Sequence, residues 1–113
     1  MVDFPYSLVN QDRAVVLRIG GYIDRRGIKQ LRETLLEEYA NGNKPIIVNF
    51  SNGEPNSLLV AIFFEILDIN NKDPRKIAFS NLNEPIHRAL EATGILSLCA
   101  VFSDENEALE RLQ

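Results

Sequence analysis

Residues 45–67 read PIIVNFSNGEPNSLLVAIFFEIL, and this stretch decides the fold. Residues 45–50 form an apolar, β-branched run that is typical of an inner strand of a sheet. A cluster of Gly, Pro and Asn then breaks the run, and the apolar segment that follows predicts a helix from about Ser57 to Asn70. A buried strand that leads into a helix is the building unit of an α/β protein.

The sequence before this unit predicts two strands and a helix. The expected strands are Phe4–Val9 and Ala14–Ile19, which turn-forming residues separate. Asp24 is the expected N-cap of the helix, and Gly42 is its expected stop. The apolar positions that recur at helical spacing between them are Ile28, Leu31, Leu35 and Tyr39.

The sequence after this unit predicts two further pairs of a strand and a helix. Arg75–Ser80 is the next expected strand, and Glu84-Pro85 opens a helix that Gly94 closes. A last short strand is expected within Ile95–Phe102. A final helix ends near Leu112, and the residues expected to cap and stabilise its start are Ser103, Asp104, Glu105 and Glu107.

The order of elements is therefore β-β-α-β-α-β-α-β-α, which predicts an α/β fold with a mixed sheet flanked by helices. Helices between the later strands return the chain to the same edge, so these strands should run parallel. A length of 113 residues suits one domain over residues 1–113. With 45% hydrophobic and 25% charged residues, the chain should fold rather than stay disordered.

Composition argues against several classes of function. The net charge of -4 and the lack of a basic patch argue against nucleic acid as a partner. A single cysteine, with no pattern of a secretion signal, predicts a cytoplasmic protein. The longest apolar run, Leu58–Phe64, is far shorter than the roughly 20 residues needed to cross a bilayer, so no membrane insertion is expected.

The residues that usually carry catalysis are scarce. His87 is the only histidine and Cys99 the only thiol, so spacing predicts no metal cluster and no Ser-His-Asp set. Gly20-Gly21 follows a strand but lacks the GxGxxG spacing, and no phosphate-binding GxxxxGK[ST] loop occurs. We therefore expect no enzyme, no cofactor and no metal. The simplest interpretations are an exposed surface side chain for His87 and a buried structural thiol for Cys99.

The helix predicted after Ser57 is apolar around nearly its whole circumference. If neighbouring helices cover it, these residues are core; if they do not, it exposes an apolar patch of the kind that marks a binding surface. The core interpretation is favoured for most of these side chains, and the first turn is where a partner could reach them. The residues concerned are Leu58, Leu59, Val60, Ile62, Phe63, Phe64, Ile66, Leu67 and Ile69.

Four segments occur in an order that resembles a known family. They are VVLRIGGYID at 15–24, KPIIVNFSN at 44–52, FSNLNEPIHRALEATGI at 79–95 and VFSDENEAL at 101–109. Their order along nearly the whole chain resembles the STAS domain family, the fold of bacterial anti-sigma factor antagonists and of the cytoplasmic tails of sulfate transporters. This resemblance implies a STAS-like mixed sheet flanked by helices and a role without catalysis.

The resemblance also implies a partner site at the start of the second helix. Antagonists of this family bind an anti-sigma factor kinase there, and the kinase can phosphorylate a serine in an Asp-Ser-Ser-Gly-like motif. The phosphate adds nearly two negative charges to the interface and switches binding off. This chain has Asn56-Ser57-Leu58-Leu59 instead. Without a gap Leu58 stands opposite the phosphorylated serine, whereas a one-residue deletion places Ser57 there.

Three roles for Ser57 follow: helix N-cap, phosphorylation switch, or remnant contact in a partner site that no longer switches. The cap role is expected in every case, because serine at the start of a helix satisfies an orphan backbone N–H. Ser57 is also the candidate phosphoacceptor. The full set of residues expected to bind the partner is Tyr22, Asp24, Asn56, Ser57, Leu58 and Leu59.

The predicted function is a non-catalytic protein-binding domain, an antagonist-like partner-switching regulator of transcription whose partner is an anti-sigma factor kinase. One alternative is a docking subunit that binds constitutively in a larger signalling or transporter assembly. Another is a small-ligand or nucleotide binder that uses the loops at the carboxyl ends of the parallel strands. Whether the chain forms a homo-oligomer is left open.

Overall fold

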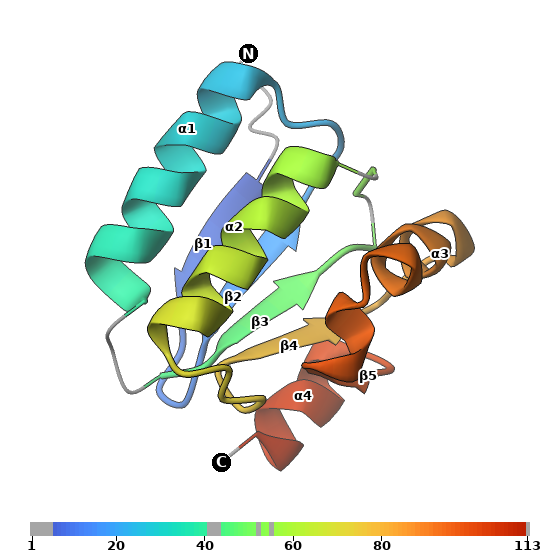
Figure 1. Ribbon diagram of the computed structural model, residues 1–113. Helices are drawn as coiled ribbons and strands as arrows, with labels where there is room; N and C mark the ends of the chain where they lie inside the picture. Colours follow the sequence, from blue (N-terminus) through green and yellow to red (C-terminus); the bar gives the residue numbers. More distant parts are fainter. Residues whose placement is uncertain (1–5, 41–43, 52, 55, 113) are drawn as a thin grey trace.

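The computed structural model describes residues 6–40, 44–51, 53–54 and 56–112. Its centre is a five-stranded sheet in the order β1-β2-β3-β4-β5 (Figure 1). β1 pairs antiparallel with β2, and β2 to β5 pair in parallel. The predicted mixed α/β sheet is therefore confirmed. The strands are β1 (Tyr6–Asn10), β2 (Val15–Ile19), β3 (Ile46–Asn49), β4 (Ile77–Ser80) and β5 (Ala100–Phe102).

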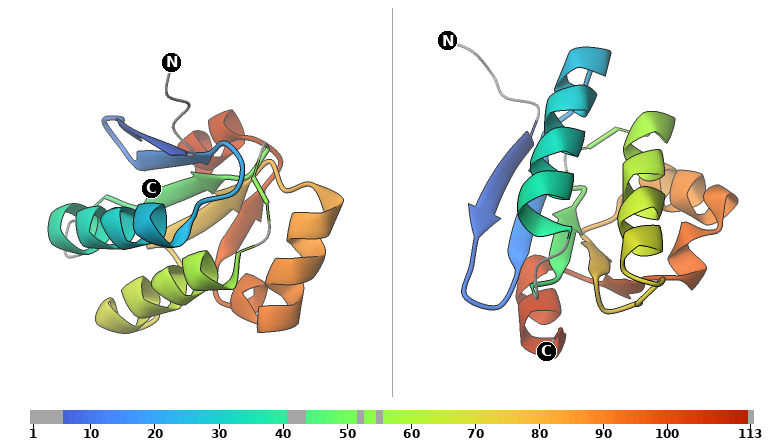
Figure 2. Two further views of the ribbon diagram at one scale, coloured as in Figure 1. Left: turned by 90° about the horizontal axis from the view of Figure 1, so that it is seen from above. Right: turned by 60° about the vertical axis from the view of Figure 1, so that its left-hand side comes forward.

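The helices follow the predicted order and lie on both faces of the sheet. α1, α2 and α3 pack against one face and α4 against the other (Figure 2). This arrangement follows from the strand order, in which β2, β3, β4 and β5 are neighbours in sequence and in the sheet. Right-handed connections between such parallel neighbours place all their helices on the same face of the sheet. The helices are α1 (Arg25–Thr34) with the π-helical turn η1 (Leu35–Tyr39), α2 (Ser57–Ile69), α3 (Glu84–Thr93) with the 3₁₀ turn η2 (Ile95–Ser97), and α4 (Glu105–Arg111).

Two apolar clusters hold the layers together. The larger lies between the sheet and α1 to α3, and in it the rings of Phe50, Phe63 and Phe79 meet with centroids 5.5 to 6.3 Å apart. The smaller lies under α4, where Ala108 and Leu112 cover the opposite face of the sheet. Alternate residues of the inner strands supply the two clusters, as the two-residue period of a strand requires.

The apolar circumference of α2 is mostly core, as expected. Its buried residues are Leu59, Val60, Ile62, Phe63, Ile66 and Leu67, and Phe64 is half-buried. Only its two ends present large apolar side chains to solvent, with Leu58 47% and Ile69 46% exposed. α2 lies beside α1, and the carboxylate of Glu65 accepts two hydrogen bonds from the guanidinium of Arg32 across this contact.

The predicted helix ends are confirmed in part. Asp24 caps α1 and Gly94, with φ of 84°, ends α3. The predicted stop at Gly42 and the strand start at Phe4 lie outside the described residues. The side-chain cap of α4 is Asp104 rather than Ser103, whose backbone N–H instead donates to the Glu107 carboxylate. Glu107 thus donates its backbone N–H to the Asp104 cap while its carboxylate accepts from the residue before the cap, an arrangement related to a capping box.

The single histidine and the single cysteine of the chain differ in their exposure to solvent. His87 is exposed on α3. Cys99 is partly buried and packs against the larger apolar cluster, and burial raises the pKa of its thiol to about 12. The thiolate is therefore scarce at neutral pH, which fits the expected structural role. In the described part of the chain, no helix is long and apolar enough to cross a membrane.

Candidate functional site

The predicted partner residues gather at the carboxyl end of the sheet. α1 and α2 both begin at this end, so the loops that precede them lie near each other (Figure 1). The loop after β2 carries Tyr22 and Asp24, and the loop after β3 leads to Asn56 and Ser57. Loops at the carboxyl ends of parallel strands are the usual place for binding sites in open α/β sheets.

Asn56 joins the two loops. Its side-chain oxygen accepts from the backbone N–H groups of Leu58 at 3.0 Å and Leu59 at 3.3 Å. Its side-chain nitrogen donates to the carbonyl of Ile23, in the loop after β2, at 2.9 Å. The amide of Asn56 therefore caps α2 with its oxygen and fixes the neighbouring loop with its nitrogen. A serine hydroxyl has a single oxygen atom on a shorter side chain and could not bridge both groups.

The expectation that Ser57 caps α2 is wrong. The N-cap is Asn56, whose extended backbone (φ −153°, ψ 110°) directs its side chain back at the free N–H groups of the first turn. Ser57 already has a helical position, so its side chain leaves the helix start and is exposed to solvent. Because Asn56 performs the capping, the Ser57 hydroxyl is not needed for it.

The most exposed large apolar side chains of this end are Tyr22, 62% exposed, and Leu58, 47% exposed. Ile23 and Leu59, the residues that follow them, are each 1% exposed and lie in the core. The expectation that Leu59 contacts a partner is therefore corrected. The helical rotation that turns Leu58 outward turns Leu59 toward the sheet.

Asp24 holds the start of α1. Its carboxylate accepts from the backbone N–H of Gly27 at 2.8 Å. A side chain at Gly27 would meet the Ile23 Cγ2 at 2.8 Å, so the glycine permits the loop to pack closely against the helix. We call the five exposed or half-buried residues Tyr22, Asp24, Asn56, Ser57 and Leu58 the loop surface.

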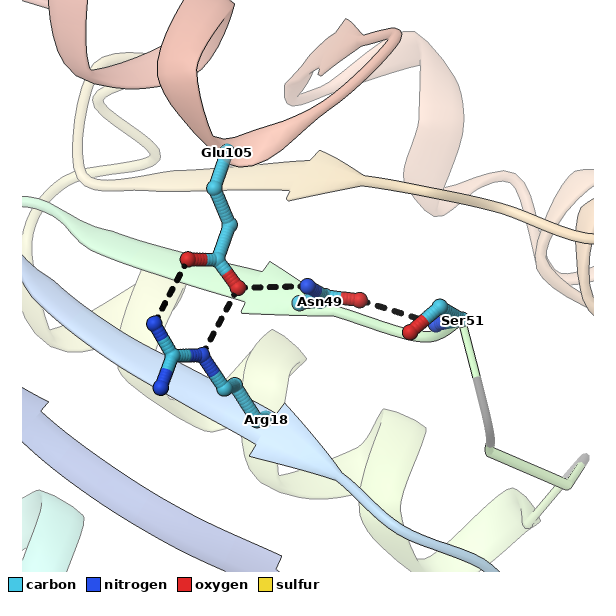
Figure 3. Close-up of polar contacts among 4 residues, drawn as sticks. All are labelled: Arg18, Asn49, Ser51 and Glu105. Atoms are coloured by element: carbon cyan, nitrogen blue, oxygen red, sulfur yellow. Dashed lines mark hydrogen bonds and ion pairs between the residues drawn. The ribbon is translucent and has the colours of Figure 1, made fainter.

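A polar cluster that the sequence did not reveal lies on the other face of the sheet (Figure 3). The Arg18 guanidinium donates two hydrogen bonds of 2.9 Å to the Glu105 carboxylate at the start of α4. Asn49 donates to the same carboxylate, and its oxygen accepts from the Ser51 backbone N–H at 2.9 Å. The cluster connects the start of α4 with β2, with the last residue of β3 and with Ser51 beyond it.

Glu105 is ionised within this cluster. The hydrogen bond from Arg18 lowers the pKa of its carboxyl, partial burial opposes this, and the hydrogen bond from Asn49 adds to the lowering. Arg18 does interrupt an apolar strand, which marks it as unusual. No local sequence pattern, however, could show that Arg18 pairs with Glu105, which lies 87 positions later.

One cavity lined by described residues lies beside the polar cluster at Glu105. The cavity beside Arg18 and Asn49 has a volume of about 190 Å³, below the roughly 300 to 1,000 Å³ of pockets that enclose drug-sized ligands. The Arg18 guanidinium at this cavity is already paired with Glu105. Among the residues described, no group of three or more His, Cys, Asp or Glu side chains could hold a metal ion.

Solved structures with the same fold include several antagonists. A putative anti-sigma factor antagonist from Thermotoga maritima is 22% identical, with 96% of this chain and 93% of that chain covered and a TM-score of 0.76. The antagonist SpoIIAA in its unphosphorylated form is 19% identical, with 94% of each chain covered and a TM-score of 0.78. SpoIIAA from Bacillus in its phosphorylated form is 19% identical, with 96% and 99% covered and a TM-score of 0.73. Identities this low establish the shared fold alone.

No curated protein matches the chain. The family model described as STAS domain, however, matches residues 6–108. This range begins with the first residue of β1 and ends within α4, so it takes in the sheet, the loop surface and the polar cluster at Glu105. The chain belongs to the STAS domain family.

Proposed function

We propose that the chain is a cytoplasmic, non-catalytic protein-binding module of the anti-sigma factor antagonist type, and that its partner contacts the loop surface. The observation that carries this proposal is the outward position of Tyr22 and Leu58, which lie close together at one end of the sheet. Their exposed fractions are 62% and 47%, whereas the residues that follow each are buried. The STAS family is generally non-catalytic, and the antagonists among the structural neighbours support a protein partner.

The loop surface has the composition of a protein interface. Aromatic and aliphatic side chains that a partner can desolvate supply most of the affinity in such interfaces, and a polar rim surrounds them. Asp24 and Asn56 hold the two loops through hydrogen bonds of 2.8 to 3.3 Å. Less conformational entropy is then lost on binding at Asp24 and Asn56, because these hydrogen bonds hold both side chains beforehand.

We further propose that phosphorylation of Ser57 switches this binding off. Its side chain is exposed beside Leu58 in the first turn of α2. A phosphate there would lie at the positive end of the helix dipole, so the helix would tolerate it. The partner would instead meet nearly two negative charges next to the apolar contact. The two forms of SpoIIAA, unphosphorylated and phosphorylated, support a switch of this kind in the family.

The binding proposal is tested by capture with a matched pair of variants. Tagged full-length chain is expressed in its source cells, cross-linked, and the captured proteins are identified by mass spectrometry. Leu58→Asp should lower recovery of the partner about tenfold or more, because a carboxylate would replace the apolar contact. Ile69→Asp is the control, because Ile69 is equally exposed at the opposite end of α2. Equal recovery with both variants would contradict the proposed surface.

The switch proposal is tested on the endogenous protein. Peptide mass spectrometry under growth and stress conditions should find a phosphorylated fraction at Ser57. The purified partner should then bind unmodified chain and fail to bind the phosphorylated chain. Ser57 that stays unmodified under all conditions, with the partner still bound through Leu58, would show a docking subunit that binds constitutively.

A further inference from the structure

The start of α1 carries an unusual pair of positive charges. Arg25 and Arg26 open the helix, both are exposed, and no acidic residue lies in its first turn. Cations at a helix N-terminus face the positive end of the helix dipole, which is an unfavourable position. Two adjacent arginines at this position therefore do not serve the stability of α1.

Two other helices and four other arginines of the chain follow the favourable pattern. α3 begins with Glu84, and the first turn of α4 contains Glu105 and Glu107. Carboxylates pair with four other arginines: Arg18, Arg32, Arg75 and Arg88. Within the described part of the chain, the side chains of Arg25 and Arg26 form no such ion pair.

These two arginines flank the loop surface. They directly follow Asp24, one oxygen of which accepts from the Gly27 backbone N–H. Glu54, in the loop before Asn56, is another exposed acid on this side, and it forms no ion pair with either arginine. The N-termini of α1 and α2 add their positive dipole ends at the same place (Figure 1). The formal charges of Arg25 and Arg26 and those of Asp24 and Glu54 cancel. What this end offers an anion is two guanidinium groups outside any ion pair of the described residues and two helix N-termini, beside the apolar surface.

We propose that the segment of the partner that occupies the loop surface is both acidic and apolar. Its carboxylates lie opposite Arg25 and Arg26, and its apolar side chains cover Tyr22 and Leu58. This inference rests on the proposed function and adds the chemistry of the partner.

Guanidinium groups bind carboxylates through two parallel hydrogen bonds, which fixes orientation as well as charge. The chain as a whole has a net charge of -4, so the remaining surface repels an acidic segment on average and directs it to this end. Charge thus selects the site, and apolar contact supplies the affinity there.

The test uses two synthetic amphipathic peptides of equal length with identical apolar residues. All polar positions are Glu in one peptide and Lys in the other. Binding is measured by amide chemical shifts of the ¹⁵N-labelled full chain. The Glu peptide should bind roughly tenfold more tightly than the Lys peptide, and added salt should weaken its binding. Its shifts should map to the loop surface and to the first turns of α1 and α2.

Two double variants separate local charge from net charge. Arg25→Glu with Arg26→Glu should reverse the preference between the peptides. It should also fold, because acids at the start of α1 suit the helix dipole. Arg13→Glu with Lys72→Glu is the control, because it changes the net charge equally at the other end of the sheet and should leave the preference unchanged. Melting curves check the fold of each variant.

Equal binding of the two peptides, binding of neither, or shifts outside the loop surface would overturn the inference. An unchanged preference in the Arg25 and Arg26 variant would do the same. The proposed function fails separately, when Leu58→Asp does not reduce capture of the cellular partner. A partner that is lost with Leu58→Asp and kept with the arginine variant would leave the proposed function standing without an acidic segment.

Discussion

The two ends of the sheet differ in what their side chains do. At the amino end, polar side chains reach inward: Lys76, only 6% exposed, donates from its Nζ to the carbonyls of Tyr39 at 2.7 Å and Lys44 at 3.2 Å. Asn70 donates to the carbonyl of Ala40 at 2.7 Å. At the carboxyl end, the apolar side chains of Tyr22 and Leu58 reach outward from two neighbouring segments, whereas at the amino end the exposed Ile69 lies beside these inward polar side chains.

This difference indicates that stability and binding are divided between the ends. The last carbonyls of a helix lack partners within the helix. At the amino end, Asn70, which directly follows α2, and Lys76, which directly precedes β4, supply donors to the carbonyls of Ala40 and Tyr39 at the end of the first helical segment. These hydrogen bonds hold the helical layer against the sheet at the amino end, which is the end away from the proposed partner site. Substitutions at the amino end should change folding and leave binding intact, whereas those at the carboxyl end should mainly change binding.

The largest expected effect is at Lys76. Lys76→Met removes a buried donor and leaves the carbonyls of Tyr39 and Lys44 short of hydrogen bonds, so the free energy of unfolding should fall by about 2 to 3 kcal/mol. Urea denaturation measures the change. Binding of the folded variant to the captured partner should equal that of the original chain.

Lys72→Met is the control for this substitution, because Lys72 is exposed at the same end of the sheet. It should change the unfolding free energy by less than about 0.5 kcal/mol. If Lys76→Met were as stable as Lys72→Met, the amino end would not be the stabilising end.

Asn56, at the carboxyl end, should affect both stability and binding. Asn56→Ala removes the cap of α2 and the hydrogen bond to Ile23, so the unfolding free energy should fall by about 1 to 2 kcal/mol and partner binding should weaken. Asn56→Asp keeps an oxygen acceptor for the cap and loses the donor to Ile23. It should retain most of the stability while binding falls, as urea denaturation and partner titration would show. Equal stability of the two variants would contradict the capping role.

The sequence predicted the fold because the signals for strands and helices are local. The β-branched run at 45–50 and the caps at Asp24 and Gly94 each specify their element within a few residues. The neighbourhood of Tyr22 and Asn56 was likewise foreseen, through the resemblance to the family. Its residues do lie at one end of the sheet.

The detail of the site depends on geometry that the sequence does not display. Asn56 and Ser57 are both residues that cap helices, and only the extended backbone of Asn56 decides between them. Leu58 and Leu59 are identical in type, and the rotation of α2 sends one outward and one into the core. The pairing of Arg18 with Glu105 joins residues too distant in sequence for any periodic pattern to connect.

A substitution at Glu105 would show whether the ion pair with Arg18 stabilises the carboxyl end of the sheet on the face that α4 covers. The pKa of Glu105 is lowered by Arg18, so the folded state gains stability from the ionised carboxylate above the usual pKa near 4.5. This gain is lost as the pH falls through the lowered pKa. Glu105→Gln should therefore reduce the unfolding free energy by about 0.5 to 1 kcal/mol at neutral pH, since Arg18 is half exposed and water screens the pair.

The two proteins should approach equal stability in acid, which denaturation at a series of pH values measures. Glu91→Gln, at an exposed position of α3, is the control and should leave the pH dependence unchanged. A constant difference between the original chain and Glu105→Gln at every pH would mean that the charge of Glu105 contributes nothing.

The smallest expected effect on stability is at the two exposed ends of α2, and it separates the two ends of the sheet most directly. Leu58 and Ile69 are 47% and 46% exposed, so each loses a similar, small amount of buried surface when replaced. Leu58→Ser and Ile69→Ser should each change the unfolding free energy by less than about 1 kcal/mol. Only Leu58→Ser should weaken partner binding in a titration. If Ile69→Ser weakened binding as much, the interface would extend along α2, and the amino end would take part in recognition as well as in stability.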